Sequence, residues 1–531
     1  MPLRDGAGFV AFDVLVAKCC PGNRINDARM RQILAAETLG EYMKVWKGTV
    51  DRHDAPPEVN GADVVTRFGT FRPSCDAFSP SMRAVLGGLW MGLLACGAGV
   101  VAALSPARVR RPGRFALIIG TGPSDVTRDG SDERFVEFCR KGPISTLHAP
   151  AMLMVQSGGD SQSGFDSGIL YAKRPLYRLV RVSHADWLQR LGVAGRLMLR
   201  AVAAVVKSPF DARSALFMRD AMEAVVVRAL VRWGALGEVM ITNSAATRQA
   251  IWIRDGSVPC AMVWYSENSK WIWQDGIHDA ELPMYRHLHV GVHWVWTEAH
   301  ANWLRSLGHS GPVHVVGPIL WYLPRRVPTK PAPDVLWVTV FDIIPVSEDF
   351  PEQIGFIDNY YSVDRCLAFL GGVLVAAEAA RAQTGLPIQV RIKPKRFQPK
   401  ASSVYVREVE SLIGLGALAC METSADLFDA ARDSLVSVVQ PFSSPALVAA
   451  EQGCLACYYD AAQVLERPSS LSPEIPLVST TEELCALIIT SANRYSLIVS
   501  QGNTGARLPS IKDRETSSGA FGTIRREDMT R

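Results

Sequence analysis

A strand, a turn and a helix follow one another in the stretch Val438-Val439-Gln440-Pro441-Phe442-Ser443-Ser444-Pro445-Ala446-Leu447. The apolar run Leu435 to Val439 predicts a short buried strand. Ser444 is typical of a helix N-cap, and Pro445 of the first helical residue, because the N–H that proline lacks would have no partner there. We expect this helix to end at Gly453. A buried strand that leads into a capped helix is the basic unit of an α/β fold.

The same stretch can form a phosphate site from its backbone. Two hydroxyls, unpaired N–H groups and the positive end of the helix dipole would meet where Ser443 and Ser444 lie, and this suits a nucleotide phosphate. An ordinary capped helix in an α/β domain is the alternative, because most capped helices bind no ligand.

A basic motif, Arg391-Ile392-Lys393-Pro394-Lys395-Arg396, stands at the end of a strand predicted over Ile388 to Ile392. The carboxyl ends of parallel strands face the ligand crevice, so these cations and the serine pair could hold a diphosphate or phosphodiester. They would stabilise the leaving phosphate as its bond to a sugar breaks. A solvated basic loop is the alternative. The predicted nucleotide-binding residues are Arg391, Lys393, Lys395, Ser443, Ser444 and Pro445.

Composition limits the class of protein. A chain of 531 residues predicts two large domains with appendages, and 48% hydrophobic with 20% charged residues indicates a globular protein. The net charge of +4 is too small to favour nucleic acid as a partner. Eleven cysteines without a disulfide-like framework favour a reducing, cytoplasmic compartment. For the C-x-x-C pair Cys454 and Cys457 a buried strand is favoured over zinc or redox chemistry, since no second pair lies nearby.

Short apolar runs alternate with helical stretches from Phe115 onward, which indicates parallel α/β architecture. The predicted fold is two Rossmann-like domains that face a cleft, after an N-terminal extension. The predicted bounds are 1–110 for the extension, 111–322 for the first domain, 323–334 for a proline-rich linker, 335–500 for the second domain and 501–531 for a mobile tail.

Two segments suggest a membrane. Residues 85–104 carry no charge, are long enough to cross a hydrocarbon core and precede Arg108, Arg110, Arg111 and Arg114, which would place the rest in the cytoplasm. Five glycines leave a buried or interfacial hairpin open. In 191–207 a basic side opposes an apolar side, so the helix could lie on an anionic membrane or pack its apolar side on the core. The two sides are Arg196, Arg200 and Lys207, and Leu191, Met198, Val202 and Val205.

The segment Pro441 to Ala446 resembles the Pro-Phe-Thr-Ser motif that names a family of bacterial polysaccharide-biosynthesis proteins, with serine here in place of threonine. The likeness covers about residues 115–460. It includes Val340-Phe341-Asp342 with Pro345, Trp264-Tyr265-Ser266-Glu267-Asn268, and Val316-Gly317-Pro318. More distantly, a basic motif followed by a serine pair is similar to the nucleotide site of GT-B sialyltransferases, which implies a CMP-linked donor. Lys393-Pro394-Lys395 stands where those enzymes have a His-Pro pair, so the identity of the nucleotide's base stays open.

The turn Gly120-Thr121-Gly122-Pro123-Ser124 is similar to the Gly-Asn-Gly-Pro-Ser turn of another sialyltransferase group, with threonine in place of asparagine. A glycine-rich turn after a first strand lets a ligand approach the backbone, although a purely structural tight turn is the alternative. The candidate cleft residues are Gly120, Gly122, Ser124, Tyr265, Ser266 and Asn268.

Glycosyl transfer needs a base that removes a proton from the acceptor hydroxyl. Glu267, directly after a strand, is the first choice and Asp342 the second, and either could instead accept backbone N–H groups. A group of histidines is predicted to be core or surface rather than a metal site, because His289 and His293 lie in a predicted strand without the glutamate of a zinc helix. The group comprises His287, His289, His293, His300, His309 and His314.

Together these features predict a GT-B glycosyltransferase of surface polysaccharide or lipopolysaccharide O-antigen biosynthesis. Its partners would be a nucleotide-sugar, a lipid-linked glycan acceptor and the inner face of the cytoplasmic membrane, with no resident cofactor, no metal and no nucleic acid. The second domain would bind the nucleotide, and the first would hold the acceptor and supply Glu267. A nucleotide-sugar epimerase or hydrolase, and a non-catalytic scaffold of a polysaccharide assembly complex, are the alternatives.

Overall fold

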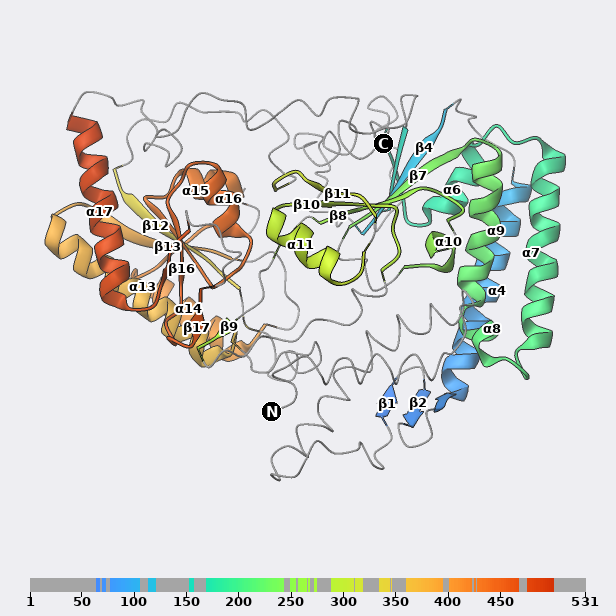
Figure 1. Ribbon diagram of the computed structural model, residues 1–531, viewed down its shortest axis with the longest axis horizontal. Helices are drawn as coiled ribbons and strands as arrows, with labels where there is room; N and C mark the ends of the chain where they lie inside the picture. The colour runs from blue at the N-terminus through green and yellow to red at the C-terminus, as the bar shows by residue number, and fades with distance from the viewer. Residues whose placement is uncertain are drawn as a thin grey trace. The chain divides into compact units, whose positions relative to one another are not determined.

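The computed structural model divides into two compact units (Figure 1). Where they are described, residues up to Trp264 and from Leu288 to Pro318 belong to unit 1, and residues 266–274 and those from Asp334 onward belong to unit 2. The described residues are 64–66, 69–72, 77–105, 113–120, 152–156, 169–242, 249–254, 256–264, 266–267, 272–274, 288–309, 311–318, 334–343, 345, 360–394, 401–422, 425, 427–467 and 475–500.

Unit 1 is built on a parallel sheet whose described strands run in the order β11-β10-β8-β7-β4-β5-β6. Counted along the chain from β4, the order is 3-2-1-4-5-6-7, which is the doubly wound arrangement. The strands are β4 (Phe115–Ile119), β5 (Met152–Gln156), β6 (Ile169–Ala172), β7 (Leu236–Thr242), β8 (Cys260–Val263), β10 (Val292–Val295) and β11 (Val313–Val315).

The central strands of unit 1 are apolar on both faces because both faces are covered. Phe115 and Leu117 face one core cluster, and Ala116 and Ile118 of the same strand face another. Helices cover the larger cluster: α4 (Met82–Leu104), α6 (Pro175–Val182), α7 (Trp187–Lys207), α9 (Met218–Arg232), α10 (Ile251–Arg254) and α11 (Glu298–Ser306). The short helix α8 (Ala212–Leu216) packs against α4, α7 and α9. A small antiparallel sheet of β1 (Val64–Thr66), β2 (Gly69–Arg72) and β3 (Ala77–Pro80) precedes α4.

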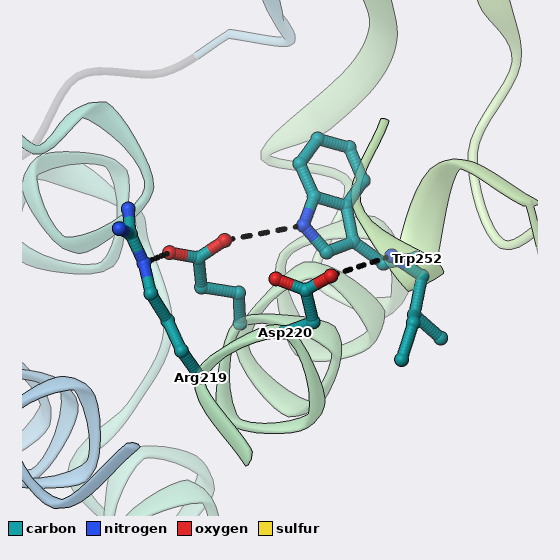
Figure 2. A network of polar contacts seen from close by, with 5 residues as sticks. Arg219, Asp220 and Trp252 are labelled. Carbon is teal, nitrogen blue, oxygen red and sulfur yellow. Dashed lines mark hydrogen bonds and ion pairs between the residues drawn. The ribbon is translucent and has the colours of Figure 1, made fainter. Parts of the chain in front are cut away.

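Polar contacts fasten α10 to α9 (Figure 2). Glu223 on α9 accepts from Arg219 Nε at 2.9 Å and from Trp252 Nε1 at 3.5 Å. Asp220 accepts from the backbone N–H of Ile251 at 3.3 Å. Burial raises the pKa of Glu223, and Arg219 opposes that rise. The network thus holds the segment after β7 against the helix that leads into β7.

Helix α4 packs closely against α7, α8 and α9, beside which it runs in Figure 1. Its contact side is made of small residues. A Cβ on Gly88 would lie 2.5 Å from the carbonyl oxygen of Ala215, and one on Gly99 would lie 2.6 Å from Leu197 Cδ1. With 23 residues and a mean hydropathy of 1.9, α4 is long and apolar enough to cross a membrane by length and composition alone, and 22% of its most apolar window is buried.

Unit 2 has a parallel sheet whose described strands run in the order β14-β13-β12-β15-β16-β18. Counted from β12 this is 3-2-1-4-5-6, the same doubly wound order as in unit 1. The strands are β12 (Leu336–Phe341), β13 (Ile388–Lys393), β14 (Ala419–Cys420), β15 (Val436–Val439), β16 (Ala456–Tyr459) and β18 (Leu477–Val478). The predicted fold of two Rossmann-like α/β halves is therefore confirmed.

The helices of unit 2 cover its sheet from both faces. Helices α13 (Val363–Thr384) and α17 (Thr481–Ser500) pack on one core cluster, and α15 (Leu427–Arg432) and α16 (Pro445–Glu451) pack on the other. Helix α14 (Ser403–Gly414) lies between β13 and β14 along the chain. A separate pair, β9 (Ile272–Trp273) with β17 (Leu465–Glu466), is antiparallel.

The segment 266–274 departs from the predicted division of the chain. The predicted bounds assign it to the first domain, but its described residues belong to unit 2, where β9 pairs with β17. Residues 1–63, 319–333 and 501–531, which hold most of the predicted extension, the linker and the tail, lie outside the described residues.

The packing of α4 predicts opposite effects for one substitution at two glycines of that helix. Gly88→Ala should lower the thermal unfolding temperature of unit 1, because its methyl group would meet the Ala215 backbone. Gly97→Ala should raise the free energy of unfolding by about 0.5–1 kcal/mol, because its methyl meets no described atom within 4 Å and alanine favours helix. Equal effects at the two positions would contradict the packing of α4.

Candidate functional site

The strand order of unit 2 reverses between β12 and β15, and ligands of doubly wound sheets bind outside the carboxyl ends of the strands at such a point. Phe341 and Val439, the last residues of the two strands, are register partners. Asp342 and Gln440 follow them directly and therefore lie at the same edge. Three predicted site segments, at Asp342, Lys393 and Ser443-Ser444, follow or end neighbouring strands at this edge.

The turn that leaves β15 has an unusual backbone. Ser443 donates to the carbonyl oxygen of Gln440 through both its N–H, at 3.2 Å, and its hydroxyl, at 2.9 Å. Pro441 and Phe442 occupy the middle, and Phe442 has a φ of 62°, as the third residue of a type II turn requires. Glycine is usual there, because a side chain in the left-handed region costs about 1–2 kcal/mol.

Burial of the Phe442 ring offsets this cost. The ring is 1% exposed and meets Tyr458 edge to face, with the centroids 5.4 Å apart. Tyr361 donates its hydroxyl to the carbonyl oxygen of Pro441 at 3.1 Å. Rigid contacts on both sides thus fix the turn that delivers Ser443 and Ser444.

Ser444 stands at the predicted N-cap and Pro445 at the first helical position, as expected, but the cap itself is missing. The backbone of Ser444 is helical, with φ −56° and ψ −31°, so its hydroxyl does not bond the first turn of α16. Its Oγ donates to the carbonyl oxygen of Glu267 at 2.6 Å and accepts from the N–H of Glu267 at 3.1 Å. Ser444 therefore fastens the 266–274 segment to the turn after β15.

Glu267 consequently lies in the same unit as the serine pair and not in the opposite one. Glu267 is 6% exposed. Burial raises the pKa of Tyr458, and the negative charge of Glu267 adds to that rise. Ser266, a predicted cleft residue, is half-buried beside it. Tyr265, Asn268 and Lys395 lie outside the described residues.

Asp342 lies between neighbouring strand ends. Its N–H donates to the carbonyl oxygen of Lys393 at 3.1 Å, and its Oδ1 accepts from the Tyr405 hydroxyl at 2.7 Å. Burial, together with this carboxylate, raises the pKa of Tyr405. Burial raises the pKa of Cys366 to about 12, while a hydrogen bond from Gln440 lowers it and the charge of Asp342 raises it. Asp342 and Gln440 therefore both influence the same buried thiol.

Lys393 ends β13 and is 7% exposed, with Nζ donating to the carbonyl oxygen of Pro394 at 3.1 Å. Burial raises the pKa of Cys420, Asp342 adds to the rise and Lys393 opposes it, so both charges act on that thiol. A cation, a carboxylate and the serine turn are thereby gathered at the carboxyl edge.

Arg391 is placed differently from the prediction. Its Nε donates to Thr339 Oγ1 at 2.8 Å, an amino group donates to the carbonyl oxygen of Ala430 at 3.1 Å, and the guanidinium lies 5.3 Å from the centroid of the Trp337 ring. It shares a face with Lys393 but lies two residues further from the edge, a step of about 6.6 Å along a strand. The guanidinium thus joins β12, β13 and α15, which is a structural role.

Sequence reasoning missed Asp460, which directly follows β16 and is 0% exposed. Its Oδ1 accepts from the Tyr360 hydroxyl at 2.6 Å, and its Oδ2 accepts from the N–H groups of Val464 and Leu465, each at 2.8 Å. It therefore holds the loop that begins β17, the partner of β9. Its place directly after an apolar strand was the available signal.

The corresponding strand reversal of unit 1 lies between β4 and β7. Gly120 follows β4 with a φ of 88°, and its carbonyl oxygen accepts from Thr242 Oγ1, at the end of β7, at 2.7 Å. The predicted cleft residue Gly120 is thus at the switch point, while Gly122 and Ser124 lie outside the described residues.

Three histidines of unit 1, His293, His300 and His309, form part of an aromatic cluster. Trp264 Nε1 donates to His293 Nδ1 at 3.2 Å, and the Trp264 ring lies 4.6 Å from the His300 ring. The His309 ring lies 4.9 Å from that of His293. His314 is half-buried and packs on Trp294, and His289 is exposed. His287 lies outside the described residues.

Across the described part of the chain, no group of three or more His, Cys, Asp or Glu side chains could hold a metal ion. Cys457 is buried in β16 and Cys454 is half-buried before it, as expected for a strand.

Comparison with known families decides the membership of the chain. A family model described as polysaccharide biosynthesis PFTS motif protein matches residues 198–488, more than half of the sequence. The chain belongs to this PFTS motif family. The resemblance predicted from Pro441 to Ala446 is therefore confirmed, and the Ser443-Ser444 turn lies within the matched region.

None of the curated proteins matches this chain. Among solved structures, α,α-trehalose-6-phosphate synthase from Burkholderia multivorans has 11% identity and a TM-score of 0.40, covering 76% of this chain and 94% of that one. An E. coli trehalose-6-phosphate structure with bound UDP-2-fluoro glucose has 10% identity and a TM-score of 0.39, covering 76% and 95%. A Listeria monocytogenes protein described as a UDP-N-acetylglucosamine 2-epimerase has 8% sequence identity and a TM-score of 0.37. The match covers 75% of this chain and 93% of that protein. With TM-scores below 0.5, these likenesses carry no argument about ligand or reaction.

The left-handed backbone of Phe442 can be tested with paired substitutions. Phe442→Ala and Phe442→Gly both remove a buried ring and should each cost about 3–5 kcal/mol of unfolding free energy. The glycine variant should be the more stable of the two by about 1 kcal/mol, because φ is 62°. Phe369, inside helix α13, is the control: there the alanine variant should be more stable than the glycine variant in urea unfolding, because alanine favours helix. Equal stability of the two Phe442 variants would contradict the turn.

His293 predicts a loss of stability in acid. Burial, helped by His309 and His300, lowers the pKa of His293 to about 3, whereas histidine in an unfolded chain titrates near about 6.5. Between these values the unfolded chain binds a proton that the folded chain does not. The free energy of unfolding should therefore fall by up to about 1.4 kcal/mol per pH unit as pH drops below about 6.5.

Urea unfolding between pH 7 and pH 5 measures this effect. His293→Gln keeps an acceptor for Trp264 and should flatten the pH dependence, whereas His184→Gln, at an exposed position, should not. Identical pH dependences for the two variants would rule out His293 as the source.

Proposed function

We propose that this PFTS motif protein is a glycosyltransferase, which takes a glycosyl group from a nucleotide-sugar and adds it to a growing surface polysaccharide. The observation that carries the proposal is the arrangement at the switch point of unit 2. There Asp342, Lys393 and the Gln440 to Ser444 turn occupy neighbouring strand ends. Family membership in polysaccharide biosynthesis supports a sugar as the transferred group.

Lys393 and the serine turn are proposed to bind the phosphates of the donor. An ammonium group offers a compact charge, and hydroxyl and N–H donors near it stabilise the negative charge that grows on the leaving nucleotide. Helix α16 has only seven residues, so the charge of Lys393 matters more here than the helix dipole. Lys395, two residues beyond Lys393, would add a second cation to the same site.

Asp342 is the better placed of the two predicted bases. It is half-buried at the carboxyl edge, whereas Glu267 is 6% exposed and its backbone holds Ser444. In the proposed step the acceptor hydroxyl oxygen forms a bond to the anomeric carbon, the bond from that carbon to phosphate oxygen breaks, and the nucleotide leaves with the electron pair. Asp342 takes the hydroxyl proton. Glu267 is then a positioning residue.

The finer identity of the substrates belongs to the same proposal. A CMP-linked donor follows from the similarity of the basic motif and serine pair to sialyltransferases, and UDP and GDP are the other donor classes. The acceptor is proposed to be a lipid-linked glycan, such as an O-antigen intermediate, at the cytoplasmic face of the inner membrane. No resident cofactor is part of the proposal.

A thermal-shift screen with CMP, UDP and GDP tests the donor site. One nucleotide should raise the unfolding temperature of the unchanged protein by several degrees, since bound ligand stabilises the folded state. Lys393→Ala should abolish the shift. Arg381→Ala removes a cation from an exposed position near the far end of α13, and should retain the shift. No shift with any nucleotide, or the same shift in both variants, would overturn the proposal.

Transfer assays with the selected nucleotide-sugar separate the two carboxylates. Asp342→Asn should reduce kcat by about 100-fold or more with little change in the nucleotide shift, as loss of a general base does. Glu267→Gln should leave kcat within about tenfold, because its backbone can still hold Ser444. An isomeric sugar formed without acceptor would identify an epimerase instead.

A further inference from the structure

Helix α4 presents small residues to the protein and large apolar residues outward. Its buried positions are Gly92, Ala95, Cys96, Gly99, Ala102 and Ala103. Its exposed positions include Met82, Leu86, Trp90, Met91, Leu93, Leu94, Val101 and Leu104. A surface helix of a water-soluble protein shows the reverse arrangement, with large apolar residues inward and polar residues outward. The outer face of α4 therefore suits an apolar environment.

Helix α7, next to α4, also presents large apolar residues outward. Its core side holds Arg190, Val193, Ala194, Leu197 and Ala201. Its outer side exposes Trp187, Leu188, Leu191, Met198, Leu199, Val202, Val205 and Val206, and the following turn exposes Phe210 by 92%. The alternative that the apolar side of 191–207 packs on the core is thus wrong. The exposed apolar residues of two neighbouring helices form a larger apolar surface than the single, scattered apolar residues of an ordinary protein surface.

Charge selects the environment that this face fits. Neither α4 nor α7 contains a carboxylate, and their exposed cations are Arg83, Arg196, Arg200 and Lys207. The last three are spaced by four and seven residues and so line one edge of the exposed side of α7. A second copy of this face would bring like charges together, whereas anionic lipid headgroups would compensate them.

We propose that the outer faces of α4 and α7 form a docking surface for an anionic lipid bilayer. The apolar side chains enter the acyl layer of one leaflet, while Arg196, Arg200 and Lys207 contact headgroup phosphates. Trp187 and Phe210, just inside and beyond the ends of α7, lie where aromatic rings favour the boundary between headgroups and acyl chains.

The packing of α4 favours a helix that lies in the leaflet over one that crosses the bilayer. It contacts α8 near Gly88, α9 near Gly92 and α7 near Gly99, so unit 1 accompanies it along most of its length. Crossing would draw the charged first turn of α9, with Arg219 and Asp220, toward the hydrocarbon. The docking surface would hold unit 1 at the leaflet that contains a lipid-linked acceptor, and only this last step rests on the proposed function.

Vesicle flotation of the full chain tests the surface. The protein should float with phosphatidylcholine vesicles that contain about a quarter phosphatidylglycerol, and less with phosphatidylcholine alone. Leu199→Glu with Val202→Glu should lower the bound fraction about tenfold or more. Neutralising Arg196, Arg200 and Lys207 to Gln should weaken binding to the anionic vesicles about fivefold per charge at low salt. Circular dichroism checks that each variant is folded.

Val375→Glu is the matched control, because Val375 is 61% exposed on α13 of unit 2, and it should float like the unchanged protein. Absence of flotation by the unchanged protein, or equal flotation of the Leu199 and Val375 variants, would overturn the proposal. So would a dimer in sedimentation that Leu199→Glu dissociates without any vesicle binding, since a second copy would then cover the face. The nucleotide shift should survive in every variant, so the two proposals fail separately.

Discussion

Helices cover both faces of the parallel sheet of unit 2, and this constraint determines where the candidate site lies. From β12 the chain first adds β13 and β14 on one side of this strand and then adds β15, β16 and β18 on its other side. The strand order therefore reverses between β12 and β15. The connections that follow β12 and β15 go to opposite faces of the sheet, so the carboxyl ends of these two strands are left open to a ligand. Asp342 and Gln440 occupy these ends because of strand order alone, and Lys393 joins them from the neighbouring strand.

The turn after β15 shows how the site is made rigid. A left-handed Phe442 is unfavourable by itself, and its persistence depends on the buried contact with Tyr458 and on Tyr361 at Pro441. Ser444 then binds the backbone of Glu267 on both sides, and Asp460 holds the loop that leads to β17. The serine pair is thus supported by three separate segments of unit 2.

Local patterns predicted the elements well and the partners poorly. The strands predicted over 388–392 and 435–439 lie within one residue of the observed bounds, and the helix starts at Pro445 as predicted, because apolar runs and a proline at the first helical position are local signals. The place of Glu267 depends on a pairing between residues 272–273 and 465–466, almost two hundred positions apart, which no local pattern encodes. Arg391 and Lys393 look equivalent in sequence and lie on the same face of β13, two residues apart. The Arg391 guanidinium is nevertheless bound inside the unit, whereas Lys393 ends the strand at the carboxyl edge. Which side of α7 meets the core likewise depended on tertiary packing.

A crystal structure of the full chain with a bound nucleotide-sugar analogue would test the central claim most directly. The account predicts phosphate oxygens within hydrogen-bond distance of Lys393 Nζ and of donors in the Ser443-Ser444 turn, outside the carboxyl ends of β12 and β15. Phosphates bound instead at the switch point of unit 1, beside Gly120, would contradict it.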